Sequence, residues 1–456
     1  MAEPGRPHRI VGRIYANLGR LLGGKAAAGL LSLGYLGMAS RSLGPADYGV
    51  LMLVHGYVMA VGAVVGIPGW HAVIRYGALA LASEDQPRLA SLLRLSAILE
   101  GVGGLLGIIA AAVFAPLVGP HLGWSPAAIA LAVPYSFAVL ATLRMTPTGY
   151  LQLAGRFDLI SANYLVAPVV RLAGVLAALA LHAHLRGFLV VWMASVVTEW
   201  AVVWAMGLMV AARRLPGETL MGPVGAAVAE NPGFWKFLLA AKADVLLSDV
   251  PARLVLLTIG WGLGPAAAGL YSVAQRATVV FSQPAHILGQ AAYSDLAGLA
   301  AVPGQGAAIR KALLHCVAIA GLVASPLLLL ILVFAERLSM LMAGKGFRAA
   351  APIMIWLAVA RLIAMLSPPV SAALTALGRP GLSVIGNFAT SLAFLLALPL
   401  MLRWWGLNGA GLNVVLQALA CGLLLSWFIL RETSSHVRAI PTGSAGLAST
   451  TPETRP

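Results

Sequence analysis

The chain has 456 residues, of which 60% are hydrophobic and 10% charged, whereas soluble domains have roughly 45–50% apolar and 25% charged residues. This composition predicts an integral membrane protein and excludes a soluble enzyme or binding domain. The net charge of +15 does not indicate nucleic-acid binding, because most basic residues lie in short loops between apolar stretches, a distribution that orients membrane proteins.

Apolar stretches long enough to cross a bilayer follow one another along the chain. A transmembrane helix needs about 20 predominantly apolar residues, and this criterion predicts an all-α polytopic protein with about 12 transmembrane helices. They are expected near 18–40, 49–73, 93–115, 127–146, 160–181, 187–210, 236–260, 268–290, 311–334, 350–372, 382–402 and 408–430.

A charged segment at 211–235 separates six of these stretches from the other six. We therefore expect two six-helix lobes joined by a cytoplasmic linker, with no inserted soluble domain. The tail is rich in Ser, Thr, Pro and Gly, which favours disorder. The predicted organisation is a cytoplasmic N-terminal segment at 1–17, an N-lobe at 18–210, the linker at 211–235, a C-lobe at 236–430 and a disordered cytoplasmic tail at 431–456.

Two short motifs occur twice and indicate that the lobes are duplicated units. The segment 43–49 returns 220 residues later at 263–269, and 151–159 is answered at 374–382, again between apolar stretches. Glycine permits a tight reversal and proline prevents the helix from continuing through it, and internal repeats are common in secondary transporters. The turn residues are Gly44, Pro45 and Gly49 in one copy, and Gly264, Pro265 and Gly269 in the other.

The loop charges predict that both termini lie in the cytoplasm. With that orientation, most Arg and Lys residues of the short loops fall on the inner side, as the positive-inside rule requires. Arg337, Lys345 and Arg348 form the one local exception, because they fall together on the far side.

Seven basic residues are left at membrane depth when those assigned to the loops on the two sides are set aside. Each would cost about 2.5–3.5 kcal/mol at the bilayer centre if it faced lipid, so we expect most of them to face polar surroundings. A residue near a helix end can instead extend its charge to the membrane surface, and an isolated arginine can be satisfied by a neighbouring helix. The seven are Arg20, Lys25, Arg171, Lys242, Arg253, Arg276 and Arg361.

Two neighbouring helices carry polar stripes that predict a shared water-filled cavity. In the seventh, Lys242, Asp249 and Arg253 are spaced i, i+7 and i+11, which places them on one face. The alternative is a structural ion pair among these three residues, and hydrogen bonds between helices would equally explain the second stripe. In the eighth helix the stripe consists of Ser272, Arg276, Gln283 and Gln290.

Carboxylates inside the helices are candidates for ion coupling. Glu199, near the middle of the sixth helix, and Asp249 could carry a proton or a cation, although a buried neutral glutamic acid would explain Glu199 equally well. His55 is expected to pack in the core. No catalytic motif, metal site or cofactor site is predicted. The sequence leaves open coupling of transport to a proton or sodium gradient.

The turn motifs and their surroundings carry a family resemblance. Ser40–Gly49 and its counterpart Leu263–Ala274 resemble the Wzx-type oligosaccharide flippases, in the polysaccharide transporter branch of the multidrug/oligosaccharidyl-lipid/polysaccharide exporter superfamily. The resemblance implies two six-helix lobes around a central, cation-lined cavity. This chain departs from the family pattern in one place. Members commonly have a basic residue directly after the aspartate of the seventh helix, whereas here the basic residue comes four positions after Asp249, at Arg253.

The resemblance implies a bacterial inner-membrane flippase rather than an enzyme. Its cargo would be an undecaprenyl-pyrophosphate-linked oligosaccharide for O-antigen, capsule or exopolysaccharide, with a polysaccharide polymerase and assembly proteins as partners and no nucleic acid. Alternatives are a drug/cation antiporter of the same superfamily, a lipid II flippase, and a membrane polysaccharide polymerase or ligase. The residues expected to bind substrate are Arg276, Lys25, Lys242, Arg253, Arg361, Ser272, Gln283 and Gln290.

Overall fold

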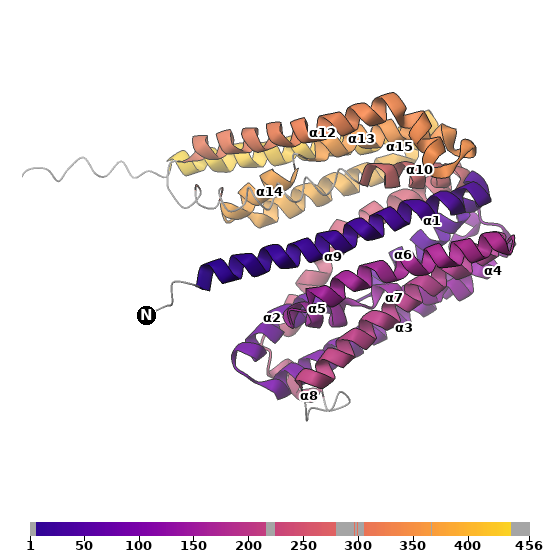
Figure 1. The fold of residues 1–456 in the computed structure, drawn as a ribbon. Helices are drawn as coiled ribbons and strands as arrows, with labels where there is room; N and C mark the ends of the chain where they lie inside the picture. Colours follow the sequence, from indigo (N-terminus) through magenta and orange to yellow (C-terminus); the bar gives the residue numbers. More distant parts are fainter. Residues whose placement is uncertain are drawn as a thin grey trace, which may run out of the picture. The chain divides into compact units, whose positions relative to one another are not determined.

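The computed structural model shows an all-helical protein (Figure 1). It describes residues 6–215, 224–279, 296, 299, 305–365 and 367–438, and no strand occurs within these ranges. The expected polar residues Gln283 and Gln290 lie outside them. The predicted all-α class is therefore confirmed.

Within the described ranges, the helices follow one another with short connections. The α-helices are α1 (Arg6–Val65), α2 (Gly69–Ala82), α3 (Gln86–Val118), α4 (Pro126–Tyr135), α5 (Met145–Leu153), α6 (Phe157–Ala180), α7 (Leu185–Arg214), α8 (Gly225–Ala229), α9 (Phe234–Leu263), α10 (Pro265–Thr278), α12 (Gly306–Ala343), α13 (Ala351–Ala364), α14 (Ser367–Ala376) and α15 (Pro380–Arg438). Short 3₁₀ helices are η1 (Pro120–Leu122), η2 (Ser136–Thr142) and η4 (Lys345–Ala350). Helix α15 continues to Arg438, so residues 431–438 of the expected disordered tail are helical.

Nine stretches of the described residues are long and apolar enough to cross a membrane. The first, Gly19–Val65, has 47 residues, which at 1.5 Å per residue is about 70 Å, more than twice the roughly 30 Å of a bilayer core. It is broken at Gly44, and the 55-residue stretch Pro380–Ser434 is broken in the same way at Gly406. Each of these two stretches therefore supplies two helices.

By its backbone contacts the chain divides into two compact units. One comprises Met1–Arg276, Phe334–Met354 and Leu395–Ala410, and the other comprises the intervening segments from Ala277 to the C-terminus. In the first unit α1 packs against α6 and α9, and α6 lies beside α7 (Figure 1). These boundaries differ from those of the two expected lobes, and the two-lobe arrangement stays a prediction.

The first duplicated motif has the same backbone conformation in both copies. Gly44 has φ 70° and ψ 176°, and Gly264 has φ 83° and ψ 176°. Only glycine adopts such angles without strain, and a proline follows each of them. The chain therefore reverses at the same point in both copies.

The second duplicated motif also ends two helices in the same way. Gly155 and Gly378 have φ values of 71° and 76°. In the first copy the Arg156 N–H donates to the Leu151 carbonyl, and in the second the Arg379 N–H donates to the Leu374 carbonyl, both at 2.8 Å. This six-to-one hydrogen bond across a left-handed glycine is a Schellman cap, so the sequence repeat is also a structural repeat.

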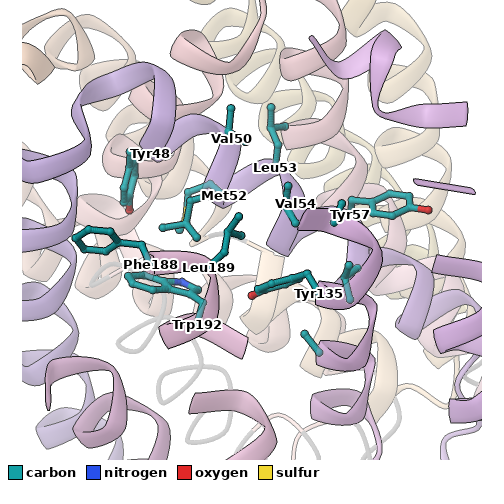
Figure 2. Packing of buried hydrophobic residues seen from close by; sticks show 14 of the residues in the cluster. Tyr48, Val50, Met52, Leu53, Val54, Tyr57, Tyr135, Phe188, Leu189 and Trp192 are labelled. Carbon is teal, nitrogen blue, oxygen red and sulfur yellow. The ribbon is translucent and has the colours of Figure 1, made fainter. Parts of the chain in front are cut away.

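A dense apolar core holds the first unit together (Figure 2). The second half of α1 contributes Tyr48 and Leu53, which pack in one cluster with Tyr135 of α4 and with Phe188 and Trp192 of α7. Each of these five side chains is at most 2% exposed. Close packing leaves little room for movement, so this core fixes the positions of α1, α4 and α7. Helices α1 and α7 line the cavity described next, and α4 leads directly into η2, which also lines it.

A buried carboxylate from α3 caps the start of α5. The Glu100 side chain is 1% exposed and accepts hydrogen bonds from the N–H groups of Met145, at 2.6 Å, and Thr146, at 2.8 Å. The first N–H groups of a helix have no partner within the helix and favour a negative charge. Glu100 therefore holds the start of α5, including Arg144 directly before it, in place.

Candidate functional site

A cavity of about 420 Å³ lies inside the first compact unit. Its walls come from α1, η2, α5, α6, α7, α9 and α10, together with the connection that follows α1. The charged and aromatic side chains that line it are Tyr35, His55, Arg144, Arg171, Glu199, Asp249, Arg253 and Arg276.

Helices α9 and α10 bring three of the predicted site residues to this cavity. Asp249 and Arg253 line it from α9, and Arg276 lines it from α10. All three side chains are exposed, and the described structure records no ion pair between Asp249 and Arg253. Their charged ends are therefore available to a ligand.

Arg171 lines the cavity from α6, and its neighbours fix its position. Its Nε donates to Ser195 Oγ at 2.8 Å and one terminal nitrogen donates to Tyr35 Oη at 3.2 Å. The guanidinium also lies 5.4 Å from the ring centre of Trp192. An arginine has five donors, so these two hydrogen bonds leave donors for a ligand.

Arg144 and Glu199 form an ion pair in the cavity wall. The Arg144 side chain is 40% exposed and that of Glu199 is 13% exposed. Glu199, one of the two candidates for ion coupling, is therefore not a free carboxylate in the described structure. Arg144, the N-cap residue of α5, reaches it from the opposite wall.

His55 is a further cavity residue that the sequence did not predict. It lines the cavity from α1, and its Nδ1 lies 2.8 Å from Tyr135 Oη. An isolated histidine in an apolar helix gives no indication of a site, since its partner is 80 residues away. The one available indication for Arg144 was its position inside the expected helix 127–146 rather than beyond it.

The Lys242 side chain is hydrogen-bonded to the end of α1 in the described structure. Its ammonium donates to the carbonyl of Ala63 at 2.8 Å and to that of Gly66. These carbonyls lie at the C-terminal end of α1, where cations are favourable and carbonyls lack partners within the helix. Lys242 is not one of the residues that line the cavity.

Three other predicted residues also lie away from this cavity in the described structure. Ser272 is buried and donates to the Ala268 carbonyl of its own helix at 2.8 Å. Lys25 is exposed on α1, where its ammonium lies 5.6 Å from the ring centre of Tyr164. Arg361 belongs to the second compact unit.

The cavity therefore has an excess of positive charge. Four arginines line it against two carboxylates, and one carboxylate is already paired with an arginine. Planar guanidinium groups donate two parallel hydrogen bonds to a phosphate or carboxylate. The arrangement is suited to an anionic group, and the same charge disfavours a cationic ligand.

Comparison with known proteins identifies the architecture. The sequence matches no protein-family model. The inner membrane protein YghQ of Escherichia coli (strain K12) is 26% identical over 271 residues, which cover 59% of this chain and 75% of YghQ.

Solved structures of two transporter types superimpose on most of the chain. An inward-facing multidrug resistance MATE family transporter of the MOP superfamily has a TM-score of 0.71 at 15% identity, covering 91% of this chain and 94% of its own. The chain has the fold of these transporters. The lipid II flippase MurJ, in an inward closed conformation, has a TM-score of 0.70 at 10% identity over 91% of this chain and 89% of MurJ. The Vibrio cholerae MATE transporter VcmN, in its bent form, has a TM-score of 0.58 at 15% identity, with coverage of 94% and 98%.

Proposed function

We propose that the protein is a flippase for a lipid-linked oligosaccharide that carries a pyrophosphate. The observation that carries this proposal is the excess of arginines over carboxylates in the cavity of the first unit. Solved structures with this fold include multidrug resistance transporters and a lipid II flippase. The fold therefore does not distinguish between these functions, whereas the cavity charge favours an anionic cargo.

The physical problem in such transport is the polar head of the lipid. Sugars and phosphates cannot enter the hydrocarbon core without losing their hydrogen bonds to water. A cavity of about 420 Å³ is within the roughly 300–1,000 Å³ of small-ligand pockets, which suits a pyrophosphate with its first sugar. The polyprenyl tail would stay in the surrounding lipid.

Three arginines would divide the binding of the pyrophosphate. Arg253 and Arg276 have exposed guanidinium groups on adjacent helices, and Arg171 is held rigidly by Ser195 and Tyr35. Because Arg171 is already ordered, it would lose little conformational freedom on binding.

Asp249, which lines the cavity without an ion pair in the described structure, would carry the coupling proton or cation, with Glu199 as the second candidate.

The remaining expectations complete the proposal. The protein would work without enzymatic activity, by alternating access between two six-helix lobes at 18–210 and 236–430, with both termini in the cytoplasm. It would lie in a bacterial inner membrane, which the relative YghQ supports by its name. A polysaccharide polymerase and its assembly proteins would receive the cargo.

Arg276→Ala tests the proposal directly. In a deletion strain complemented with each variant, surface glycan and membrane-protein abundance are measured together. We expect Arg276→Ala to abolish export at normal abundance, and Arg276→Lys to keep part of it, since the charge remains but the planar fork is lost. Arg403→Ala is the matched control, because Arg403 is exposed on α15 and does not line the cavity.

Two results would contradict the proposal. Full export by Arg276→Ala would remove the anion-binding role, and a parallel loss of export and abundance would show that Arg276 stabilises the fold.

The alternative functions predict other outcomes. A drug antiporter would extrude amphiphilic cations from vesicles, and a lipid II flippase would translocate lipid II with a similar dependence on Arg276.

A further inference from the structure

A second hollow lies at the first turn motif, away from the cavity. It has a volume of about 530 Å³ and is bordered on one side by the break in α1 and on the other by the end of α12 and the start of η4. All of its lining residues belong to the first compact unit. Arg41 and Lys345, from opposite sides, are the two charged residues that line it.

Contacts between the two sides give the hollow a fixed shape. The Arg41 guanidinium donates to the Leu341 carbonyl, and Ser40 Oγ donates to the Ala343 carbonyl at 3.3 Å. Gly344 has φ 96°, and a Cβ atom there would lie 2.7 Å from Arg41 Cγ. The Arg41 side chain is therefore ordered by the end of α12, and among the described residues one of its five donors has a partner.

At the second copy of the turn, a glycine packs against the turn proline in the same way, but no Lys or Arg is present. At the first turn, a Cβ atom on Gly346 would lie 3.3 Å from Pro45 Cδ, and at the second turn a Cβ atom on Gly123 would lie 3.1 Å from Pro265 Cδ. The segments 119–126 and 260–270, which meet at the second turn, contain no Lys or Arg. The packing of a glycine loop on the turn proline therefore does not require Arg41 or Lys345.

The nearby acidic residues leave Lys345 unneutralised. Glu336 pairs with Arg348 at 2.8 Å, and Asp47 is exposed without lining the hollow. Lys345 is exposed and has no ion pair in the described structure. Lys345 also belongs to the group of loop charges that departs from the positive-inside pattern. The predicted membrane orientation therefore does not explain why a lysine stands here.

We propose that this hollow is a second anion site, which binds a phosphate-bearing group between Arg41 and Lys345. Charged side chains of both types form charge-assisted hydrogen bonds with phosphate oxygens. Because Arg41 and Lys345 line the same hollow from opposite sides, we place the anion between them. The identification of that anion as the pyrophosphate of the transported lipid rests on the proposed function. The headgroup phosphate of a membrane lipid has the same chemistry.

Inorganic pyrophosphate is the probe for the site. The purified full-length protein, in detergent without anionic lipid, is titrated calorimetrically with pyrophosphate. We expect Lys345→Gln to weaken one class of sites by about two- to fivefold, the range of a single exposed charge contact, while Arg276→Ala leaves that class unchanged. Arg403→Gln is the control for loss of a surface charge.

The variants separate this inference from the proposed function. Identical isotherms for the wild type and Lys345→Gln would overturn the second site, whatever Arg276→Ala does. A class of sites that Arg276→Ala removes and Lys345→Gln does not would belong to the cavity alone. Repeating the titration with phosphatidylglycerol identifies the source of the anion: competition at the class that depends on Lys345 assigns it to lipid headgroups, and no competition assigns it to pyrophosphate.

Discussion

Gly49 of α1 and Gly269 of α10 lie face to face where the two turn motifs cross. A Cβ atom on Gly49 would overlap the Pro265 carbonyl oxygen and lie 3.1 Å from the Gly269 nitrogen. The reverse also holds, since a Cβ atom on Gly269 would overlap the Pro45 carbonyl oxygen and lie 3.1 Å from the Gly49 nitrogen. The two copies of the motif therefore pack reciprocally, backbone against backbone, and the second glycine of each copy allows this approach.

We predict that Gly49→Ala lowers the stability of the protein. The added methyl group forces the two helices apart, and overpacking of this kind costs about 1–3 kcal/mol. Gly101→Ala is the matched control, because nothing lies within 4 Å of a Cβ atom there and alanine favours a helix by up to about 1 kcal/mol. Thermal unfolding in detergent measures both, and equal midpoints for the two variants would contradict the crossing.

We predict that the Arg144–Glu199 pair contributes to stability as a unit. Removing one partner leaves the other charge in the wall, and breaking a buried pair costs about 3–5 kcal/mol, less here because Arg144 is 40% exposed. A double-mutant cycle of Arg144→Gln and Glu199→Gln should give a coupling energy of about 0.5–3 kcal/mol. Additive effects would show that the pair is not formed.

The same Glu199→Gln variant tests ion coupling. If Glu199 carries the coupling ion, transport in vesicles should lose its dependence on pH or sodium. A transport rate that keeps the wild-type dependence would remove Glu199 from consideration and leave Asp249, which lines the cavity without an ion pair in the described structure, as the remaining candidate.

We predict that Lys242→Met destabilises the protein without a specific effect on transport. The change leaves the carbonyls of Ala63 and Gly66 without this donor. Both residues are only half-buried, so we expect a cost at or below about 1–3 kcal/mol, the cost of a buried polar group left without a partner. Lys236→Met on the same helix is the control, because Lys236 is exposed. Loss of export at normal abundance and thermal midpoint would return Lys242 to the substrate site.

We predict that Glu100→Gln destabilises the start of α5. The amide retains one acceptor oxygen for two N–H groups, and the negative charge that favours a helix N-terminus is lost, so we expect a cost of about 1–3 kcal/mol. Asp244→Asn provides the comparison, since Asp244 is exposed on α9. Unfolding midpoints that fall equally in both variants would argue against the cap.

The sequence by itself determined the helical class, most helix positions and the duplication. These features depend on local properties: apolar stretches of membrane length predict helices, and a glycine that needs a left-handed conformation occupies the same place in both copies, as Gly44 and Gly264 show. The stripe on α9 was equally local, because helical periodicity puts Asp249 and Arg253 on one face, and both reach the cavity.

Only the tertiary structure decided which charges share the cavity. Arg144 and Glu199 are 55 residues apart, and Lys242 bonds to carbonyls 176 and 179 residues away, so no spacing in the sequence indicates either contact. A charge within the membrane must find a polar partner, and the sequence shows that requirement. Whether the partner is a ligand, a carboxylate or the end of another helix depends on which backbones the packed core brings together.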